Sequence, residues 1–457
     1  MHFALFLVPI ALGLLALAVP SNRLRVALVP IGGAAHLLLT VVALHQGRVE
    51  GLGGWLQLDD LGRLVLGLCS TLYFFVSLYA PGYLLGHPER DNRVFSACLL
   101  GFIGALSLVT EAHHLGLLWV AIEATTLTSV PMLNYVRSAR ALEAMWKYLL
   151  IGSVGIALAL LGSLFLAYSA LYAGLSPSLL FDDLVREAPH LSRPWLRAAF
   201  VILFVGYGTK MGLAPMHTWK PDTYGEAPGV VGALLAGCLT SGAFLAILRF
   251  FRICSAADDV GFARDLMVAV GLLSMGVAAV FMARQKDFKR MLAYSSVENM
   301  GILVVGVGIG GGAVFGSLLH MLNNGLTKGV LFLTAANIHR AYGSKSTDEV
   351  RGALRRLPAT AALFVAGFFA ITGTPPFGPF LSEFTILNAA VTAGRYAVAG
   401  LFLFMLVIVF MGMSFTVMAV AQGEPSPSAR ATTRRDRLHE VLPAAALLGL
   451  VLVLGVY

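Results

Sequence analysis

Charged residues are scarce in this sequence. Asp, Glu, Lys and Arg together make up 12% of the 457 residues, whereas hydrophobic residues make up 58% and the mean hydropathy is +0.81. In an ordinary soluble domain about 25% of the residues are charged. The composition therefore excludes such a domain and predicts an integral membrane protein.

Signals for nucleic acid and for metal are also weak. The formal net charge is +8, but in a membrane protein an excess of Lys and Arg usually reflects which loops face the cytoplasm, so we expect no nucleic-acid partner. The cysteines lie singly in apolar segments, without a CxxC pair, at Cys69, Cys98, Cys238 and Cys254. Zinc and iron–sulfur sites need clustered ligands, so we expect neither a metal nor a cofactor in this chain.

Motifs of catalysis and of phosphate binding are missing as well. The sequence contains no HExxH or HxxxH pair, no Walker pattern and no GxGxxG after a strand. Its glycine run, GVGIGGGAVFG (306–316), joins two apolar segments and is interpreted as a turn with close helix packing. We therefore expect no catalytic residue.

Long apolar runs, in contrast, are abundant. A helix needs about 20 apolar residues to cross a bilayer, and the runs predict an all-α membrane protein with about 14 transmembrane helices. The stretch MHFALFLVPIALGLLALAVP lacks the basic region and cleavage site of a signal peptide, and we expect it to form the first helix. The predicted spans are approximately 2–20, 24–45, 61–86, 93–110, 113–136, 144–173, 196–216, 227–252, 264–283, 291–309, 313–338, 358–393, 395–421 and 439–457.

The distribution of Lys and Arg predicts the orientation. Most of the 32 Lys and Arg residues fall in odd-numbered loops, such as RQKDFKR (284–290) and RGALRR (351–356). By the positive-inside rule these loops are cytoplasmic, so both termini are predicted on the outer side.

Two predicted spans are interrupted by proline. The seventh breaks at MGLAP (211–215), at Pro215, and the twelfth breaks at GTPPFGP (373–379), at Pro375 and Pro376. If spans 4–8 and 9–13 are two five-helix repeats, each break falls in the fourth helix of its repeat, and the second repeat is inverted. Paired broken helices are typical of inverted-repeat transporters, and two unrelated proline kinks are the alternative.

This organisation predicts four parts of the chain. They are three N-terminal helices (1–92), the first repeat (93–260), the inverted repeat (261–422), and a loop with the last helix (423–457).

A few ionisable side chains lie inside the predicted spans, at Glu123, Lys210, Glu298, His320, Lys328 and Glu383. Each costs about 2.5–3.5 kcal/mol at a helix centre, so an accidental set is improbable. Both cations well inside the spans are lysines, which can release a proton, whereas arginine stays protonated. The set therefore favours proton handling, with structural ion pairs as the alternative.

One predicted helix carries a polar ladder. His320, Asn324 and Lys328 recur every four residues and would cover about 12 Å of one face. Such a ladder can hold a hydrogen-bonded chain of water molecules. His217 lies near a span end, where a solvated interfacial side chain is the more common role.

Five motifs carry a resemblance to a known family. They are LLWVAIEATTL (117–127), KMGLAPMHTWKPDTYGEAPG (210–229), RQKDFKRMLAYSSVENMG (284–301), HMLNNGLTKGVLFL (320–333) and GTPPFGPFLSEFTIL (373–387). Together they resemble the antiporter-like, proton-translocating subunits of respiratory complex I and its relatives. In detail, three stretches are most similar to hydrogenase-4 component F, a membrane subunit of group 4 NiFe hydrogenase-type complexes; they are WVAIEATTL (119–127), KYLLIGSVGIALALLG (147–162) and AYSSVENMG (293–301).

The resemblance implies roles for particular residues. Glu123 and Lys210 match an ion pair on helices 5 and 7 that gates protonation, while Lys328 and His320 match the central relay on helix 11. Glu383 matches the terminal ionisable group on helix 12.

The sequence departs from the family pattern at three places. Many relatives carry a lysine or histidine in helix 8, where this chain has only Thr240 and Ser241. Asn299 and Asn324 occupy positions where histidine is common. A link from Lys210 to Lys328 would then depend on hydroxyls, amides and water.

The resemblance also implies a setting for the chain. It implies a prokaryotic inner (cytoplasmic) membrane, other membrane subunits and a peripheral soluble arm, whose subunits carry iron–sulfur clusters or a NiFe centre. The leading hypothesis is a subunit that moves protons within a multisubunit redox complex. The alternatives are a subunit of a cation/proton antiporter acting on Na⁺, a subunit of a proton-coupled inorganic carbon uptake complex, and a scaffold with a degenerate channel.

Overall fold

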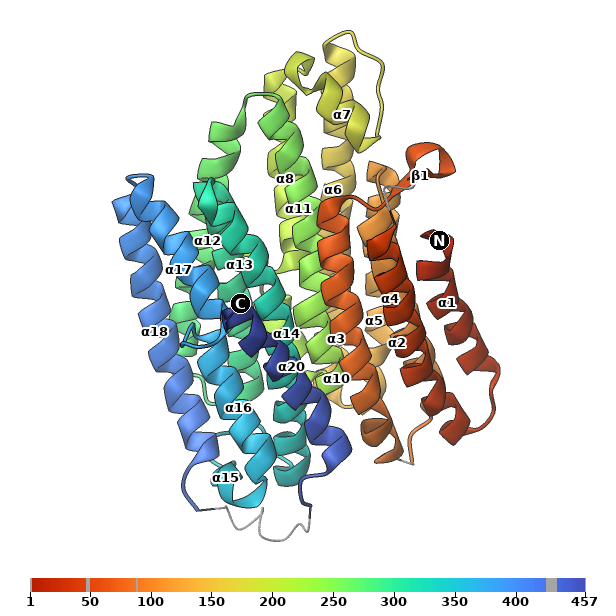
Figure 1. The fold of residues 1–457 in the computed structure, drawn as a ribbon, viewed down its shortest axis with the longest axis vertical. Coiled ribbons are helices and arrows are strands. Elements are labelled where there is room, and N and C mark those ends of the chain that lie inside the picture. Colours follow the sequence, from red (N-terminus) through yellow and green to blue (C-terminus); the bar gives the residue numbers. More distant parts are fainter. Residues whose placement is uncertain (1, 47–49, 88, 425–433, 457) are drawn as a thin grey trace. The chain divides into compact units, whose positions relative to one another are not determined.

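The computed structural model describes residues 2–46, 50–87, 89–424 and 434–456, and almost all regular structure in these ranges is α-helical (Figure 1). Within them, ten helices are long and apolar enough to cross a membrane. The prediction of an α-helical integral membrane protein is therefore confirmed. Part of the predicted C-terminal segment (423–457) lies outside the described residues.

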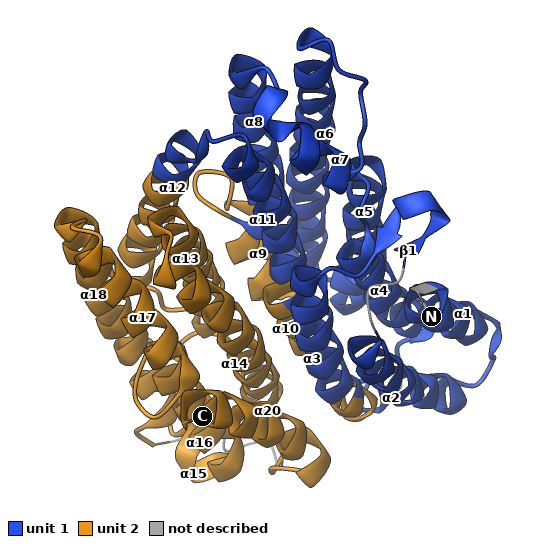
Figure 2. Cartoon of the chain, turned by 45° about the horizontal axis from the view of Figure 1, so that its top comes forward, with its two compact units in different colours: residues 1–77, 84–212, 238–266 blue, residues 78–83, 213–237, 267–457 orange. Residues whose placement is uncertain are grey.

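The chain divides into two compact units, drawn in different colours in Figure 2. Unit 1 comprises Met1–Ser77, Leu84–Gly212 and Cys238–Leu266. Its elements are α1 (His2–Ala18), α2 (Asn22–His45), β1 (Glu50–Gly51), η1 (Leu52–Gly54), β2 (Leu56–Gln57), most of α3 (Asp60–Leu85), α4 (Arg93–Glu111), α5 (Leu115–Leu133), η2 (Asn134–Val136), α6 (Ala139–Tyr172), α7 (Phe181–Glu187), η3 (Ala188–His190), α8 (Arg193–Met211) and α11 (Thr240–Ala256).

Unit 2 comprises Leu78–Tyr83, Leu213–Gly237 and Met267–Tyr457. Its elements are α9 (Trp219–Glu226), α10 (Gly229–Leu234), the start of the π-helical turn η4 (Leu235–Leu239), most of α12 (Val260–Met282), α13 (Phe288–Ile309), α14 (Gly312–Tyr342), α15 (Ala353–Arg356), α16 (Pro358–Ile371), α17 (Gly378–Thr392), α18 (Tyr396–Ala421) and α20 (Leu438–Val456).

Each predicted span coincides with a helix or with a pair of consecutive helices, although boundaries differ; α6, for example, begins at Ala139 rather than at residue 144. The short β1–β2 hairpin and α7 were not predicted. They depend on backbone bonds to distant segments, since the N–H of His113 donates to the carbonyl of Trp55 and the N–H of Phe181 donates to the carbonyl of His113. The number of spans that cross the membrane and the four-part division remain predictions.

Both predicted breaks begin at a left-handed glycine. Gly212 (φ 80°) ends α8, and Gly373 (φ 65°) follows α16. In each case a proline lies three residues further on, at Pro215 and at Pro376, and its peptide bond is cis. The two breaks therefore share a G-x-x-P pattern, and each is followed by a new helix, α9 in one case and α17 in the other.

In unit 1, the backbones of α6 and α8 pack closely against each other. A Cβ atom on Gly206 would lie 2.7 Å from the backbone nitrogen of Ala159 and 2.7 Å from the carbonyl oxygen of Gly155. Because the two helix backbones touch here, side chains later in α8 project directly onto α5 and α6.

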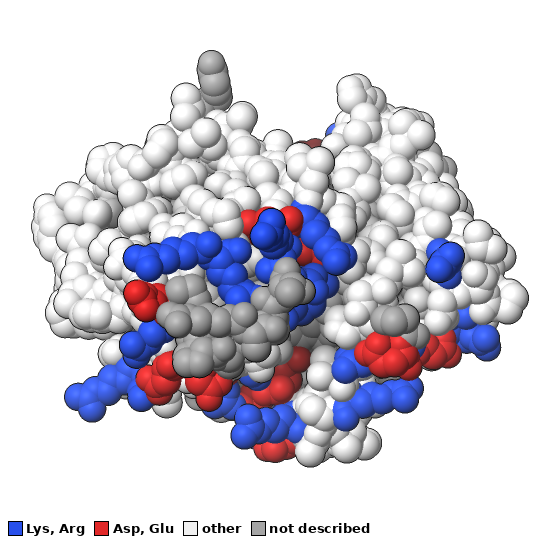
Figure 3. All heavy atoms as spheres, turned by 90° about the horizontal axis from the view of Figure 1, so that it is seen from below, with Lys and Arg blue, Asp and Glu red and all other residues white. Residues whose placement is uncertain are grey.

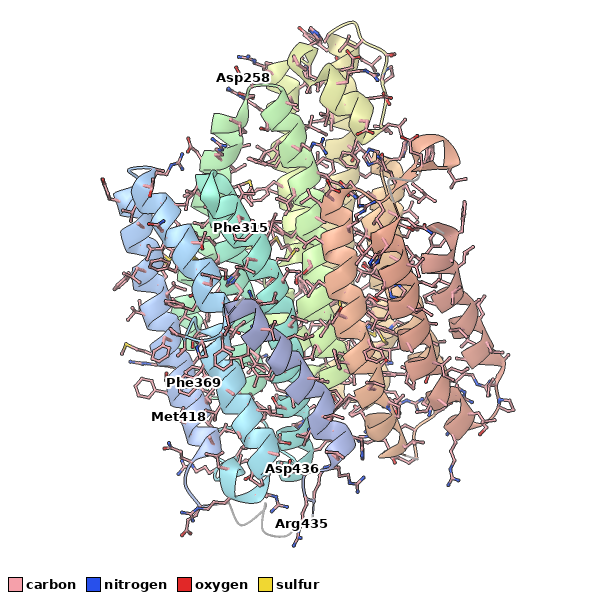
Figure 4. All side chains as sticks on the ribbon, viewed as in Figure 1. Asp258, Phe315, Phe369, Met418, Arg435 and Asp436 are labelled. Carbon is pink, nitrogen blue, oxygen red and sulfur yellow. The ribbon has the colours of Figure 1, made fainter. Side chains whose placement is uncertain are left out.

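Basic residues gather at one end of unit 2. Backbone bonds join its loops there, from Phe288 to Lys345 and from Gly352 to Gln422. Figure 3, which views the molecule from below, shows Lys and Arg side chains on this face together with Asp and Glu side chains. Arg435 lies at this end, whereas Phe315 lies toward the opposite end (Figure 4).

Candidate functional site

Lys210 is fully buried near the end of α8 in unit 1. Its Nζ donates to the hydroxyl of Thr126 at 2.5 Å and lies 4.8 Å from the centre of the Tyr148 ring. Room for the ammonium group comes from Gly152, where a Cβ atom would lie 3.0 Å from Nζ. A cation placed over an aromatic face and bonded to a hydroxyl is partly compensated for its lost hydration.

Glu123 belongs to the same network. The Thr126 hydroxyl, which accepts from Lys210, donates to Glu123 Oε2 at 3.1 Å, and Ser153 donates to Oε1 at 3.3 Å. The two charged groups are therefore joined through one hydroxyl, in a row that can pass a proton from donor to acceptor. Thr126 was not predicted, although its i+3 spacing from Glu123 places both on one helix face.

A second network in unit 2 connects three helices. His320 of α14 bonds through Nε2 to Asn299 Oδ1 and through Nδ1 to Ser382 Oγ, both at 2.9 Å. Asn299 Nδ2 in turn donates to Glu298 Oε2 at 2.7 Å. The predicted residues Glu298, Asn299 and His320 thus lie together, and all are buried.

Ser382 gives this network a movable end. Its hydroxyl is 2.8 Å from the carbonyl oxygen of Pro379 and 2.9 Å from His320 Nδ1. A serine has one proton to donate, so rotation of the hydroxyl decides which of these two groups receives it.

Lys328 lies two turns further along α14. Its Nζ donates to the hydroxyl of Ser295 and to the carbonyl oxygen of Leu292, the latter at 3.3 Å. Between it and His320, the amide of Asn324 is buried with both polar atoms lacking a partner among the described residues. Buried polar atoms are normally satisfied, so this amide is a place for an ordered water molecule.

Lys220 was missed, because the predicted seventh span ends at residue 216 and leaves it in a loop. In the structure it lies in α9, fully buried, and its Nζ donates to the hydroxyl of Ser296 at 3.2 Å. The signal in the sequence was the aromatic context after the break, because Lys220 follows Trp219 directly and precedes Tyr224 by four residues.

Glu383 lies in α17 just beyond the second break. Its side chain is 7% exposed, and Oε1 has no hydrogen-bond partner among the described residues. The left-handed Gly373 makes room for the carboxyl group, since a Cβ there would lie 2.2 Å from Oε2. Glu383 also borders a pocket with Thr374, Phe384 and Leu406.

The remaining predicted residues lie at the start of α11 and at or beside the two breaks. Thr240 and Ser241 are buried at the start of α11, directly after the π-helical turn. His217 is buried between the first break and α9, while the break prolines Pro215, Pro375 and Pro376 are exposed. The described ranges contain no cluster of three or more His, Cys, Asp or Glu side chains suited to a metal.

The fold and these buried networks define a class: a multi-helix membrane subunit of antiporter-like type, with ionisable groups inside its helices. The family described as NADH:quinone oxidoreductase/Mrp antiporter, TM matches residues 112–454. The chain belongs to this family, and the predicted family membership is confirmed.

Relatives agree with this assignment. The chain is 35% identical over 348 residues to a hydrogenase-4 component F homolog of Methylacidiphilum infernorum, covering 74% of this chain and 73% of the relative. It is 30% identical over 477 residues to NADH-quinone oxidoreductase subunit N of Desulforudis audaxviator, covering 99% and 92%.

Solved structures show the same fold. A chain of the Mrp complex from Dietzia sp. matches with a TM-score of 0.87 at 19% identity, over 99% of this chain and 94% of that chain. A chain of respiratory complex I from Thermus thermophilus matches with a TM-score of 0.84 at 24% identity, over 100% and 95%.

Proposed function

We propose that this chain translocates protons as a subunit of a multisubunit redox complex in a prokaryotic inner membrane. The observation that carries the proposal is the unbroken row of hydrogen bonds from Glu298 through Asn299 and His320 to Ser382. The row connects α13, α14 and α17, and its side chains are buried. His320 and Ser382 can each donate and accept, so they can pass a proton by exchanging bonds, whereas the amides of Asn299 and Asn324 would orient the water molecules that complete the row.

Each residue has a role in this scheme. Lys328 and His320 hold and hand on the proton in unit 2, with Glu383 as its terminal acceptor. In unit 1, Glu123, Thr126 and Lys210 form the gate, because the lysine holds its proton more firmly when the carboxylate stays close.

The redox setting is supported by the named relatives, which include a hydrogenase-4 component and a subunit of NADH-quinone oxidoreductase. We expect electrons to be handled by a peripheral arm whose subunits hold iron–sulfur clusters or a NiFe centre. Other membrane subunits would pack beside this chain in the bilayer.

The finer topology belongs to the same proposal. Fourteen spans are supported by the apolar runs of the sequence, which coincide with helices. Two inverted five-helix repeats are supported by the G-x-x-P pattern shared by the two breaks. The basic end of unit 2 would face the cytoplasm and both termini the outer side. In a test, an Arg435→Cys side chain should react with an impermeant thiol reagent in inverted vesicles only, and labelling of intact cells would contradict this orientation.

A cation/proton antiporter is the second candidate, because the matching family also bears the name of the Mrp antiporter. It predicts that Na⁺ dissipates a preformed pH gradient across inverted vesicles. Under the leading proposal, Na⁺ leaves the gradient unchanged.

The decisive experiment uses whatever assembly copurifies with the tagged full chain. Mass spectrometry identifies the partners, and reconstituted vesicles report proton flux under a potassium diffusion potential. Lys328→Met and Lys210→Met should lower the flux by about tenfold or more, equivalent to at least about 1.4 kcal/mol on the barrier. Lys286→Met is the control, since Lys286 is an exposed lysine paired with Asp348. Unchanged flux in both buried-lysine variants, with the assembly intact, would refute the proposal.

A further inference from the structure

Lys220 occupies an unusual position in unit 2. It is the second residue of α9, a helix of eight residues that begins after the first break. Its side chain has no solvent exposure, its Nζ donates to Ser296 Oγ at 3.2 Å, and it lies 5.8 Å from the centre of the Tyr224 ring.

Three physical effects disfavour an ammonium group at this position. Burial removes its hydration, and among the described residues no ion pair includes Lys220. The first turn of a helix carries a partial positive charge, which repels a cation. Lys328, a second buried lysine, also acts on it electrostatically. An uncharged side chain would be more stable here, so packing alone does not explain a lysine.

The neighbouring hydroxyls suggest what the lysine does. Ser296 accepts from Lys220, and the adjacent residue Ser295 accepts from Lys328, so consecutive positions on α13 each hold one lysine. Two buried ammonium groups that repel one another are most stable when one of them is neutral. Glu298 of α13 is a buried carboxylate that also acts on Lys328, and one carboxylate balances one ammonium group. The arrangement therefore favours one shared proton over two.

We propose that Lys220 is a proton carrier of unit 2 that exchanges a proton with Lys328 along Ser296 and Ser295. This inference rests on the proposed function. In the transfer, an N–H bond of the Lys220 ammonium breaks and its proton passes to Ser296 Oγ, which releases its own proton to a bridging water. The water protonates Ser295, which passes its hydroxyl proton to the neutral amine of Lys328. One N–H bond is lost and one is formed, so the charge is conserved.

The second break offers an internal parallel. There the helix after the G-x-x-P segment, α17, carries the buried carboxyl group of Glu383. Each break is thus followed by a helix with a buried ionisable side chain, Lys220 in α9 and Glu383 in α17. The two breaks therefore share both a backbone pattern and a buried ionisable side chain in the helix that follows.

The test compares two substitutions at Lys220 in the reconstituted assembly. Lys220→Met has nearly the same length without the charge. Lys220→Arg keeps the charge and a donor for Ser296, but arginine does not release its proton. Both should lower proton flux under a potassium diffusion potential by about tenfold or more, because one proton site is lost. Lys286→Met should leave the flux at the wild-type value.

Folding is followed by the yield of assembled complex and its thermal unfolding midpoint. Low flux in both variants, each well folded, supports the inference, and wild-type flux in either overturns it. The Lys328→Met variant distinguishes a failure of the Lys220 inference from a failure of the proposed function. If Lys328→Met abolishes flux while Lys220→Met does not, only the role of Lys220 is refuted. If neither changes the flux, the proposed pathway fails as a whole.

Discussion

The ion pair between Arg249 and Asp59 should be a main support of unit 1. Arg249 is 3% exposed and donates to Asp59 Oδ1 at 2.8 Å. Its guanidinium also donates to three carbonyl oxygens around the end of α4, those of Val109 (3.3 Å), Thr110 (2.8 Å) and Ala112 (2.7 Å). One side chain therefore satisfies the end of α4 and holds it to Asp59, which caps the start of α3.

Arg249→Met removes this cation and leaves a buried carboxylate with an incomplete set of partners. Breaking a buried pair in this way costs about 3–5 kcal/mol. Asp59→Asn should cost less, about 1.5–3 kcal/mol, because the amide oxygen can still accept from Arg249 and Gly62. The double variant should lose less than the sum of the two single losses, since both remove the same interaction.

The free energy of unfolding can be measured by SDS titration of the protein in mixed micelles. Arg252→Met is the matched control, because Arg252 is an exposed residue of the same helix, α11. The control should change stability by less than about 0.5 kcal/mol. A loss for Arg249→Met no larger than that of the control would refute the structural role, and strictly additive losses would refute the coupling.

The same pair predicts a pH dependence. Burial raises the pKa of the Asp59 carboxyl. The charge and hydrogen bond of Arg249 and the N–H of Gly62 together lower it by more, so the pKa lies below its ordinary value of 3.8. A carboxyl with a depressed folded-state pKa contributes stability above its unfolded value. That contribution is lost as the pH falls from 3.8 through the folded pKa. Asp59→Asn should not show this loss, and an identical acid profile in both proteins would contradict the assignment.

Two further predictions concern the Glu123–Thr126–Lys210 network and the packing of α6 against α8. Thr126→Val should uncouple Glu123 from Lys210 and lower proton flux in reconstituted vesicles, whereas Thr126→Ser, which retains the hydroxyl, should restore most of it; equal flux in the two variants would exclude the hydroxyl link. Gly206→Ala should destabilise by about 1–3 kcal/mol, because its Cβ would lie 2.7 Å from backbone atoms of α6. Gly400→Ala, where nothing lies within 4 Å, should be neutral or stabilising in the same unfolding assay, and a loss as large as that of Gly206→Ala would argue against the backbone contact.

Some of the site could be read from residue types and spacing. Glu298, His320 and Lys328 stand out because ionisable side chains are costly inside apolar helices. The four-residue period along α14 correctly placed the polar ladder on one helix. The positions of Gly and Pro predicted the two breaks, because these residues change the backbone conformation locally.

Other parts of the site depend on contacts between distant segments. Thr126 and Ser382 are common hydroxyl residues, and only their positions beside Lys210 and His320 give them a role. From the sequence, Lys220 is predicted to lie in a loop, whereas in the structure it is buried in α9 and bonds to Ser296 of α13. Arg249 looks like the basic end of a helix, although it holds the end of α4, 137 residues away at Ala112.

Residue composition and spacing are enough to show that this chain lies in a lipid bilayer, roughly where its helices lie and where two of them stop. These properties follow from local hydrophobicity and local backbone geometry, which neighbouring residues set. Tertiary structure alone decided which hydroxyls, amides and carbonyls complete the buried charges. In an apolar interior each ionisable group must find its partner across helices, and no local pattern encodes that choice.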